Sequence, residues 1–176
     1  DNMSDEPAQQ YFSDGISEDI ITDLSKLKNL SVIARNSSFS FRETAAKAQE
    51  IGRDLGAQYL LEGSVRRSGN QMRITAQLID VESGHHLWAE RFDRELTDVF
   101  AVQDEITKKI VTALSIQLTS DEQQQLARDA TTSFEAYDLF LRGQELRASY
   151  SQEALENAMD MFRRAISSDP GFGRAY

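Results

Sequence analysis

The sequence predicts a two-layer α/β domain with a mixed sheet over residues 1–120, followed from Phe134 by an all-α helical hairpin. Two observations carry this fold class. Apolar and polar side chains alternate along residues 59–93, which is the period of strands with one wet face. Apolar side chains at helical spacing flank that run, and from Phe134 onwards only helical spacing remains. Helices and strands in this order are typical of a two-layer α/β fold.

The strand pair around Gly69-Asn70 is the most strongly specified part of the chain. A two-residue loop that begins with Gly suits a type II′ turn, and its position sets the register of both strands. The register pairs the residues of one face as follows: Leu61 with Leu78, Gly63 with Ala76 and Val65 with Ile74. Arg66 then faces Arg73, a like-charge pair that costs stability.

A third strand is predicted after Glu82-Ser83-Gly84, a three-residue loop with Gly in the left-handed position. We favour the register that turns Trp88 and Phe92 toward the core, with Glu90 between them. A shift by one residue would instead turn inward the other set, Leu87, Ala89 and Arg91.

A helix is predicted before the sheet, with Asp14 or Ser17 as its cap and Asn29 as its stop. Its apolar stripe consists of Ile16, Ile20, Leu24 and Leu27, with Ile21 alongside. A second helix is predicted over Thr44–Leu55, where Gly56 ends it.

Between these helices, Leu30–Arg35 is predicted to form a short buried strand. The polar residues at its end would lie at the carboxyl end of a strand, where α/β sheets often bind ligands. The candidate ligand-binding residues are therefore Arg35, Asn36, Ser37 and Ser38.

After the sheet, a long helix is predicted over Thr97–Leu118. Ser120-Asp121-Glu122-Gln123 resembles a capping box that opens a polar helix, so residues 121–133 are assigned to that helix and a linker.

From Phe134 two helices follow, and the second stops at Asp169-Pro170. The small residues of this unit would allow close packing beside Phe162: Gly143, Ala158 and Ala165. This pattern resembles a tetratricopeptide repeat, with the start of a second repeat near residues 172–176. One repeat does not bury its own apolar face, so we expect the chain to be part of a longer protein with more repeats.

Composition narrows the classes of function. The formal net charge is −10, and the acidity is spread along the chain, which argues against binding to nucleic acid phosphates. There is no cysteine, so disulfides and thiolate sites are excluded. No apolar run reaches the length of a membrane helix, so we expect no direct membrane insertion.

The sequence predicts no catalytic, metal or cofactor-binding residues. Its two histidines, His85 and His86, are neighbours whose side chains would point to opposite faces of a strand. The carboxylates near the sheet show no spacing that selects an acid–base pair: Glu62, Asp80 and Glu90. Four aromatic side chains remain as candidate contact residues: Phe39, Phe41, Tyr137 and Tyr150.

Several runs together are similar to a known family: D-N-M-S at 1–4, Y-F-S-D-G-I at 11–16, V-I-A-R-N-S-S-F at 32–39, L-E-G-S-V-R at 61–66, R-I-T-A-Q-L-I-D at 73–80 and Q-D-E-I at 103–106. They resemble the region that follows the catalytic domain in bacterial class III adenylate cyclases. That region is similar to the N-terminal domain of TolB and precedes tetratricopeptide repeats. Similar segments follow winged-helix domains in some transcriptional regulators.

The resemblance implies a non-catalytic regulatory or protein-interaction region, cytoplasmic in a cyclase and periplasmic in a membrane-anchored regulator. It implies a protein partner for the repeats. A third alternative, besides the cyclase region and the regulator region, is an uncharacterised hydrolase that would use two of the carboxylates Glu62, Asp80 and Glu90. Relatives carry an apolar strand before the D-N-M-S run, so we expect a vacant strand position beside Leu30–Arg35. Another polypeptide, as in a homodimer, or an N-terminal segment would fill that position.

Overall fold

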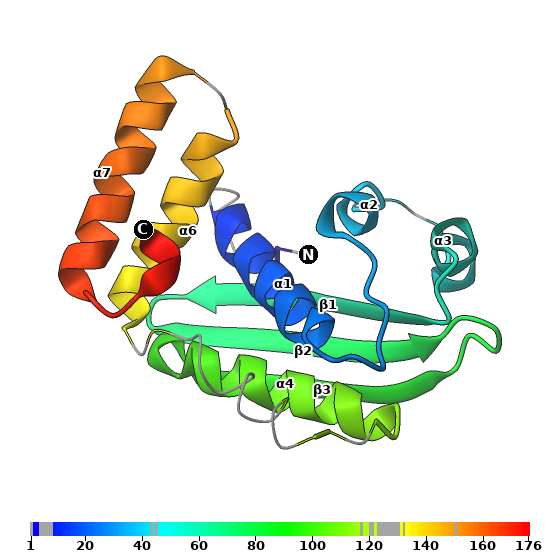
Figure 1. Cartoon of the computed structure of the whole chain (residues 1–176). Coiled ribbons are helices and arrows are strands. Elements are labelled where there is room, and N and C mark those ends of the chain that lie inside the picture. The colour runs from blue at the N-terminus through cyan, green and yellow to red at the C-terminus, as the bar shows by residue number, and fades with distance from the viewer. Residues whose placement is uncertain are drawn as a thin grey trace.

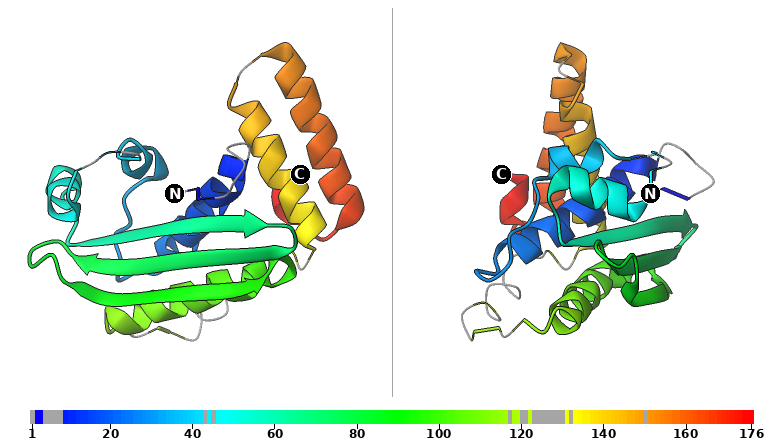
Figure 2. Two further views of the ribbon diagram at one scale, coloured as in Figure 1. Left: turned by 180° about the vertical axis from the view of Figure 1, so that it is seen from behind. Right: turned by 90° about the vertical axis from the view of Figure 1, so that its right-hand side faces the viewer.

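The computed structural model describes residues 2–3, 9–42, 44, 46–116, 118–119, 122, 131, 133–149 and 151–176. Among these residues, three strands form one antiparallel sheet, and α1 and α4 lie behind it when it is viewed from its open face (Figure 2, left). A helical hairpin, α6 and α7, extends from one end of this two-layer unit (Figure 1). The predicted α/β unit and hairpin are both present, whereas the sheet is antiparallel and not mixed.

The sheet consists of β1 (Tyr59–Ser68), β2 (Gln71–Asp80) and β3 (His86–Glu95), in the order β1-β2-β3. The predicted pairs of the first hairpin are confirmed: Leu61 with Leu78, Gly63 with Ala76, Val65 with Ile74 and Arg66 with Arg73. Gly69 has a φ of 56°, as the turn requires. The like-charge pair is relieved, because Arg73 donates to Asp93 and Arg66 donates to the carbonyl of Met3.

The register of β3 confirms the aromatic face. Phe92 pairs with Ile74 and is 1% exposed, while Leu87, which the shifted register would bury, is 46% exposed. Trp88 packs against the core beside Phe92. Gly84 has a φ of 71°, in agreement with the predicted loop. Turn geometry and hydrophobic pattern therefore select the same register.

The first helix, α1, spans Gln10–Ser25 and begins earlier than predicted. Asp14 and Ser17 lie inside it, and its start has no side-chain cap, so the predicted cap is wrong. The predicted apolar stripe is buried: Ile16, Ile20, Leu24 and Leu27. The helix also buries a second side around Gly15, where an added Cβ would lie 2.4 Å from Leu141 of α6. This second contact explains why the helix begins before the predicted cap at Asp14.

The predicted strand Leu30–Arg35 is wrong. Residues 30–34 have no regular structure, and α2 (Arg35–Phe39) follows directly. Leu30 and Val32 pack individually against the core without pairing to a strand. A short apolar run does not distinguish a strand from a packed loop, because strand formation depends on a hydrogen-bonded neighbour.

The third helix, α3, spans Ala48–Leu55 and begins later than the predicted Thr44. Gly56 ends it with a φ of 65°, as predicted. The helix lies close to the end of β2 because Gly52 leaves room for Val81; an added Cβ there would lie 2.3 Å from that side chain.

The long helix, α4, spans Val99–Ala113 and follows the short 3-10 helix η2 (Leu96–Asp98). Its buried face contains Val99, Val102, Ile106 and Ile110. The helix stops before the predicted Leu118, because Ser115 adopts a φ of 54° and Ile116 donates its backbone N–H to Val111.

The hairpin consists of α6 (Phe134–Arg147) and α7 (Gln152–Ser168), and the short 3-10 helix η3 (Gly173–Ala175) follows it. The hydroxyls of Ser133 and Ser151 cap the two helices. The predicted polar helix and linker, 121–133, lie outside the described residues except for Glu122, Thr131 and Ser133. Tyr150 also lies outside them.

Gly143 is expected to tolerate no side chain. An added Cβ would lie 2.6 Å from the Phe162 ring, so Gly143→Ala should lower the free energy of unfolding by about 1–3 kcal/mol, despite the higher helix propensity of Ala. Urea denaturation measures this change. Gly173→Ala is the control, because a Cβ there meets nothing within 4 Å. Combining Gly143→Ala with Phe162→Leu should recover part of the loss, and no recovery would contradict the steric cause.

Candidate functional site

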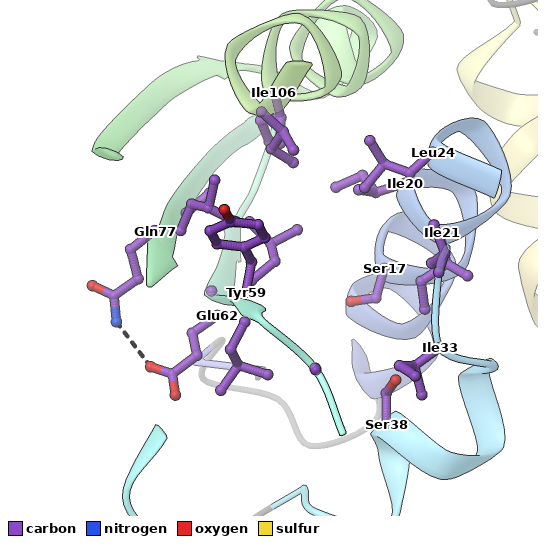
Figure 3. A pocket seen from close by; sticks show the side chains of 18 of the residues that line it. Ser17, Ile20, Ile21, Leu24, Ile33, Ser38, Tyr59, Glu62, Gln77 and Ile106 are labelled. Carbon is purple, nitrogen blue, oxygen red and sulfur yellow. Dashed lines mark hydrogen bonds between the residues drawn. The ribbon is translucent and has the colours of Figure 1, made fainter. Parts of the chain in front are cut away.

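A groove of about 1180 Å³ lies between α1 and the outer edge of β1. In Figure 3, Tyr59 and Glu62 of β1 lie on one side of it, and Ser17, Ile20 and Ile21 of α1 lie across from them. The groove exceeds the roughly 300–1,000 Å³ that is usual for small-molecule pockets.

The lining of the groove follows the edge of β1. It includes Leu61 and Val65 from the face that meets the helices, and Glu62 and Ser64 from the open face. Alternate residues of a strand point to opposite faces, so a hollow lined by both sets runs along the strand edge itself.

Three polar side chains of the groove form hydrogen bonds to other groups of the protein. Glu62 accepts a hydrogen bond from Gln77 at 2.9 Å, and the Ser17 hydroxyl donates to the carbonyl of Ser13. The Ser38 hydroxyl contacts the carbonyl of Ala34 at 3.4 Å. Each of these three polar groups therefore has a hydrogen-bond partner within the protein.

The candidate ligand residues Arg35, Asn36, Ser37 and Ser38 form the start of α2, and the strand end on which we based them does not exist. Arg35 lies 4.6 Å from the centre of the Phe39 ring and 3.4 Å from a carboxylate oxygen of Glu18. The contact with Phe39 lies within α2, whereas the ion pair with Glu18 attaches α2 to α1.

Arg42 completes this attachment. It donates to both carboxylate oxygens of Asp14, at 3.0 and 2.5 Å, and lies 4.4 Å from the centre of the Phe39 ring. Phe39 and Phe41, two of the predicted contact aromatics, are half-buried. Asp14, which we predicted as a helix cap, serves instead to hold α2 over the groove.

The carboxylates of the hydrolase alternative are not brought together. Glu62 and Glu90 lie on opposite faces of the sheet. Glu62 pairs with Gln77, whereas Glu90 pairs with Ala76, the neighbouring residue of β2, on the face of Trp88 and Phe92. Glu90 accepts from Trp88 and Lys109, which lowers its pKa, and Asp80 accepts from Ser83, which lowers its pKa. Lowered pKa values keep these groups ionised, whereas an acid catalyst needs a raised one.

The two histidines occupy the turn and the start of β3, at His85 and His86. Within the part of the protein that the structure describes, no three His, Asp or Glu side chains form a group that could hold a metal ion. In the same residues, none of the helices is both long and apolar enough to cross a membrane.

The opposite side of α1 carries a buried polar cluster that the sequence pattern did not reveal. Asp19 is 7% exposed and accepts hydrogen bonds from the Tyr137 hydroxyl at 2.5 Å, from Gln103 at 3.1 Å and from Arg174 at 2.6 Å. We call these four residues the Asp19 cluster. It joins α1, α4, α6 and η3 beside a second hollow of about 470 Å³. Burial raises the pKa of Tyr137 well above its usual value, so the hydroxyl stays protonated and donates to Asp19.

We predicted Tyr137 as a contact residue, and this is wrong. Its side chain is 1% exposed and belongs to the core. The only sign of the Asp19 cluster in the sequence is a carboxylate three residues after Ile16, at the margin of the predicted apolar stripe.

A second polar cluster surrounds Asp138 of α6. Its carboxylate accepts from the Tyr11 hydroxyl at 2.7 Å, from Arg67 of β1 at 3.2 Å and from Arg142 at 2.8 Å. Burial and the bond to Asp138 raise the pKa of Tyr11 to about 12. The two clusters connect the hairpin to the α/β unit at two points along α1.

The raised pKa of Tyr11 predicts a loss of stability in strong base. Above pH 10 the unfolded protein releases the tyrosine proton while the folded protein holds it until about pH 12, so the free energy of unfolding falls over this interval. Tyr11→Phe should flatten that fall in urea denaturation at successive pH values. Tyr176→Phe, at an exposed ring, should leave the slope unchanged. Equal slopes for wild type and Tyr11→Phe would contradict the assignment.

Comparison with known proteins gives a family and a longer relative. Residues 4–109, more than half of the chain, match the family described as "HilA/YgeH-like transcriptional regulator, second domain". The whole chain is 48% identical over 176 residues to "Putative adenylate cyclase 3" of Rhizobium meliloti (strain 1021), of which it covers 30%.

Two solved structures are similar to parts of the chain. TolB from Acinetobacter baumannii has 17% identity and a TM-score of 0.44, over 65% of this chain and 27% of that one. The LpoB C-terminal domain from Salmonella enterica has 24% identity and a TM-score of 0.28, over 44% of this chain and 53% of that one.

Proposed function

We propose a regulatory role for this chain, which belongs to the family described as "HilA/YgeH-like transcriptional regulator, second domain". In this proposal it is a non-catalytic interaction region of a larger signalling protein. The observation that supports it most directly is coverage: the chain matches its relative over its full length yet spans only 30% of that protein. A groove without a reacting set of side chains agrees with a binding role.

In the leading form of the proposal, the larger protein is a class III adenylate cyclase and this region modulates its cyclic AMP output in the cytoplasm. The name of the Rhizobium meliloti relative favours this form. Occupation of the groove would be transmitted through α1, because one side of α1 lines the groove and the other carries Asp19, bonded to α4, α6 and η3.

Deletion of this region from the full-length protein tests the leading form. Cyclic AMP formation should persist while its regulation changes, and the isolated 176-residue region should form no cyclic AMP from ATP. The double variant Ile20→Lys and Ile21→Lys in the full-length protein, inside the groove, should reproduce the change in regulation. Lys109→Gln is the control, because Lys109 pairs with Glu90 of β3 and does not line the groove. Regulation that is unchanged after deletion would overturn the proposal.

The second form places this region after a winged-helix domain in a transcriptional regulator, as a periplasmic sensor. The name of the matching family favours it. A full-length protein that binds a DNA fragment in a gel-shift assay and forms no cyclic AMP would support this form against the first.

We further propose that α6 and α7 are the first tetratricopeptide repeat of a series that binds a protein partner. Gly143 against Phe162, the burial of Ala158 and Ala165, and the exposed apolar residues Leu155 and Met159 on α7 support this. Backbone amide exchange at Leu155 and Met159 should be slower in the full-length protein than in the 176-residue region. Equal rates would count against a stacked neighbouring repeat.

A further inference from the structure

The open face of the sheet, with α1 and α4 behind it in Figure 2 (left), carries a group of arginines. The registers of the two strand pairs place Arg66, Arg73 and Asp93 in one row across the three strands. Arg91 lies on the same face in the next row, opposite Thr75. We call Arg66, Arg73, Arg91 and Asp93 the arginine patch. Its three positive charges and one negative charge give it a formal charge of +2, in a chain whose net charge is −10.

The arginine patch is open to solvent and has hydrogen-bond donors to spare. The side chains of Arg73 and Arg91 are 48% and 62% exposed. Arg73 donates to Asp93, and Arg66 donates to the carbonyl of Met3, in both cases through Nε. A guanidinium also carries N–H donors on its two terminal nitrogens. Among the described residues, those nitrogens of Arg66 and Arg73 have no hydrogen-bond acceptor in the protein.

The positive charges of the arginine patch are only partly balanced. Arg66 and Arg73 are directly paired on neighbouring strands, and like charges in this position repel. The Asp93 carboxylate is shared, because Nε of Arg73 and Nε of Arg91 lie 2.5 and 3.1 Å from its two oxygens. The Met3 carbonyl that accepts from Arg66 carries no formal charge. A further carboxylate from outside would therefore reduce the repulsion that remains.

The spacing of the arginines fits an extended acidic polypeptide. Arg73 and Arg91 are diagonal neighbours on one face, which places them roughly 7–8 Å apart. Alternate residues of an extended segment are roughly 6.5–7 Å apart and point to the same side. Two carboxylates on alternate residues would therefore each reach one guanidinium, which binds both oxygens of a carboxylate through parallel N–H bonds.

The neighbours of the arginine patch do not favour nucleic acid. Proteins that bind single strands stack the bases on aromatic side chains. The residues that surround the patch on the same face include no aromatic ring: Ser64, Ser68, Gln71, Thr75 and Glu95. The negative charge of the whole chain also repels a phosphate backbone, whereas a short acidic segment meets only the local positive charge.

We propose that the arginine patch binds an extended acidic segment of a partner protein, with carboxylates on alternate residues held by Arg73 and Arg91. Arg66 adds positive charge beside them. None of the four residues of the patch lines the groove, and all belong to the sheet, so this surface is distinct from those of the proposed function. Exposed ion pairs each contribute little and are screened by salt, so the binding is weak and depends on ionic strength.

The probe is a fluorescent peptide of about twelve residues in which Glu and Ser alternate, and its binding to the 176-residue protein is measured by fluorescence anisotropy. Arg91→Gln should weaken binding about threefold, and Arg73→Gln together with Arg91→Gln about tenfold. The matched control is Arg163→Gln with Arg164→Gln, which removes the same charge from the exposed surface of α7 and should leave the affinity unchanged. A peptide with Gln in place of each Glu should not bind. Raising the salt concentration from about 50 to about 500 mM should weaken binding at least tenfold.

Nuclear magnetic resonance locates the contact. The Glu–Ser peptide should shift the backbone amide signals of Arg73 and Arg91 and leave that of Ala165, in the hairpin, in place. Unchanged circular dichroism spectra of the variants show that the fold is retained, and Arg91→Gln alone alters only a side chain that is 62% exposed.

Several results would overturn the proposal. One is the absence of binding at millimolar peptide, and another is equal affinity of the wild type and the double variant of the patch. Equal weakening by the control on α7 would show attraction to overall charge instead of to the patch. A single-stranded oligouridylate that binds as tightly as the peptide would assign the patch to nucleic acid. A dimer that dissociates on Arg73→Gln with Arg91→Gln would assign it to a second copy. Cyclic AMP is not measured in any of these experiments, so this proposal and the proposed function fail separately.

Discussion

Phe92→Ala is expected to lower the free energy of unfolding by about 3–5 kcal/mol, which is the range for removing a large aromatic side chain from a packed core. Phe92 is 1% exposed, pairs with Ile74 and lies beside the Trp88 ring. Neighbouring backbone in a sheet does not collapse readily into a cavity, so we expect the upper part of this range. Urea denaturation followed by circular dichroism measures the change.

Leu87→Ala is the matched control on the same strand. Leu87 is exposed, so its truncation should change the free energy of unfolding by no more than about 0.5 kcal/mol. The pair of variants tests the register directly, because the shifted register would exchange the two roles. A larger loss for Leu87→Ala than for Phe92→Ala would refute the observed pairing of β3.

Asp19→Ala should lower the free energy of unfolding by about 3 kcal/mol. The substitution leaves the Tyr137 hydroxyl and the Gln103 amide in the core without their acceptor, and it removes the partner of the Arg174 guanidinium. Arg174 keeps some access to water, which limits the loss. Asp19→Asn retains one oxygen acceptor and should cost roughly half as much.

The control for Asp19 is Asp160→Ala, which breaks an exposed pair with Arg164 at 3.8 Å and should cost no more than about 0.5 kcal/mol. The Asp19 variant should also show faster amide exchange in α6, because the cluster attaches that helix to α1 and α4. If α6 amides exchange at the wild-type rate in Asp19→Ala, the cluster does not fix the hairpin to the α/β unit.

The features that local sequence predicted are those decided over short distances along the chain. A two-residue loop at Gly69 and the alternation of side chains determine the β1–β2 register without help from other elements. The close packing of Gly143 against Phe162 followed from residue size within one helical hairpin. In each case the interacting residues lie on two consecutive elements joined by one short connection, so the local sequence is sufficient to predict the contact.

Long-range contacts decided what the sequence pattern did not. Leu30–Arg35 has the composition of a strand, but a strand needs a hydrogen-bonded neighbour. At the outer edge of β1, Asn2 and not Leu30–Arg35 forms a bridge, with Val65. The candidate site at Arg35–Ser38 lost the strand end on which it was based, and of its four residues Ser38 lines the groove. Asp19 and Asp138 acquire their roles only where α1 meets the hairpin, through partners 118 and 127 positions apart in the sequence. Sequence alone determined how each hairpin pairs, whereas tertiary structure decided which surfaces stay open, because burial depends on what packs from elsewhere in the molecule.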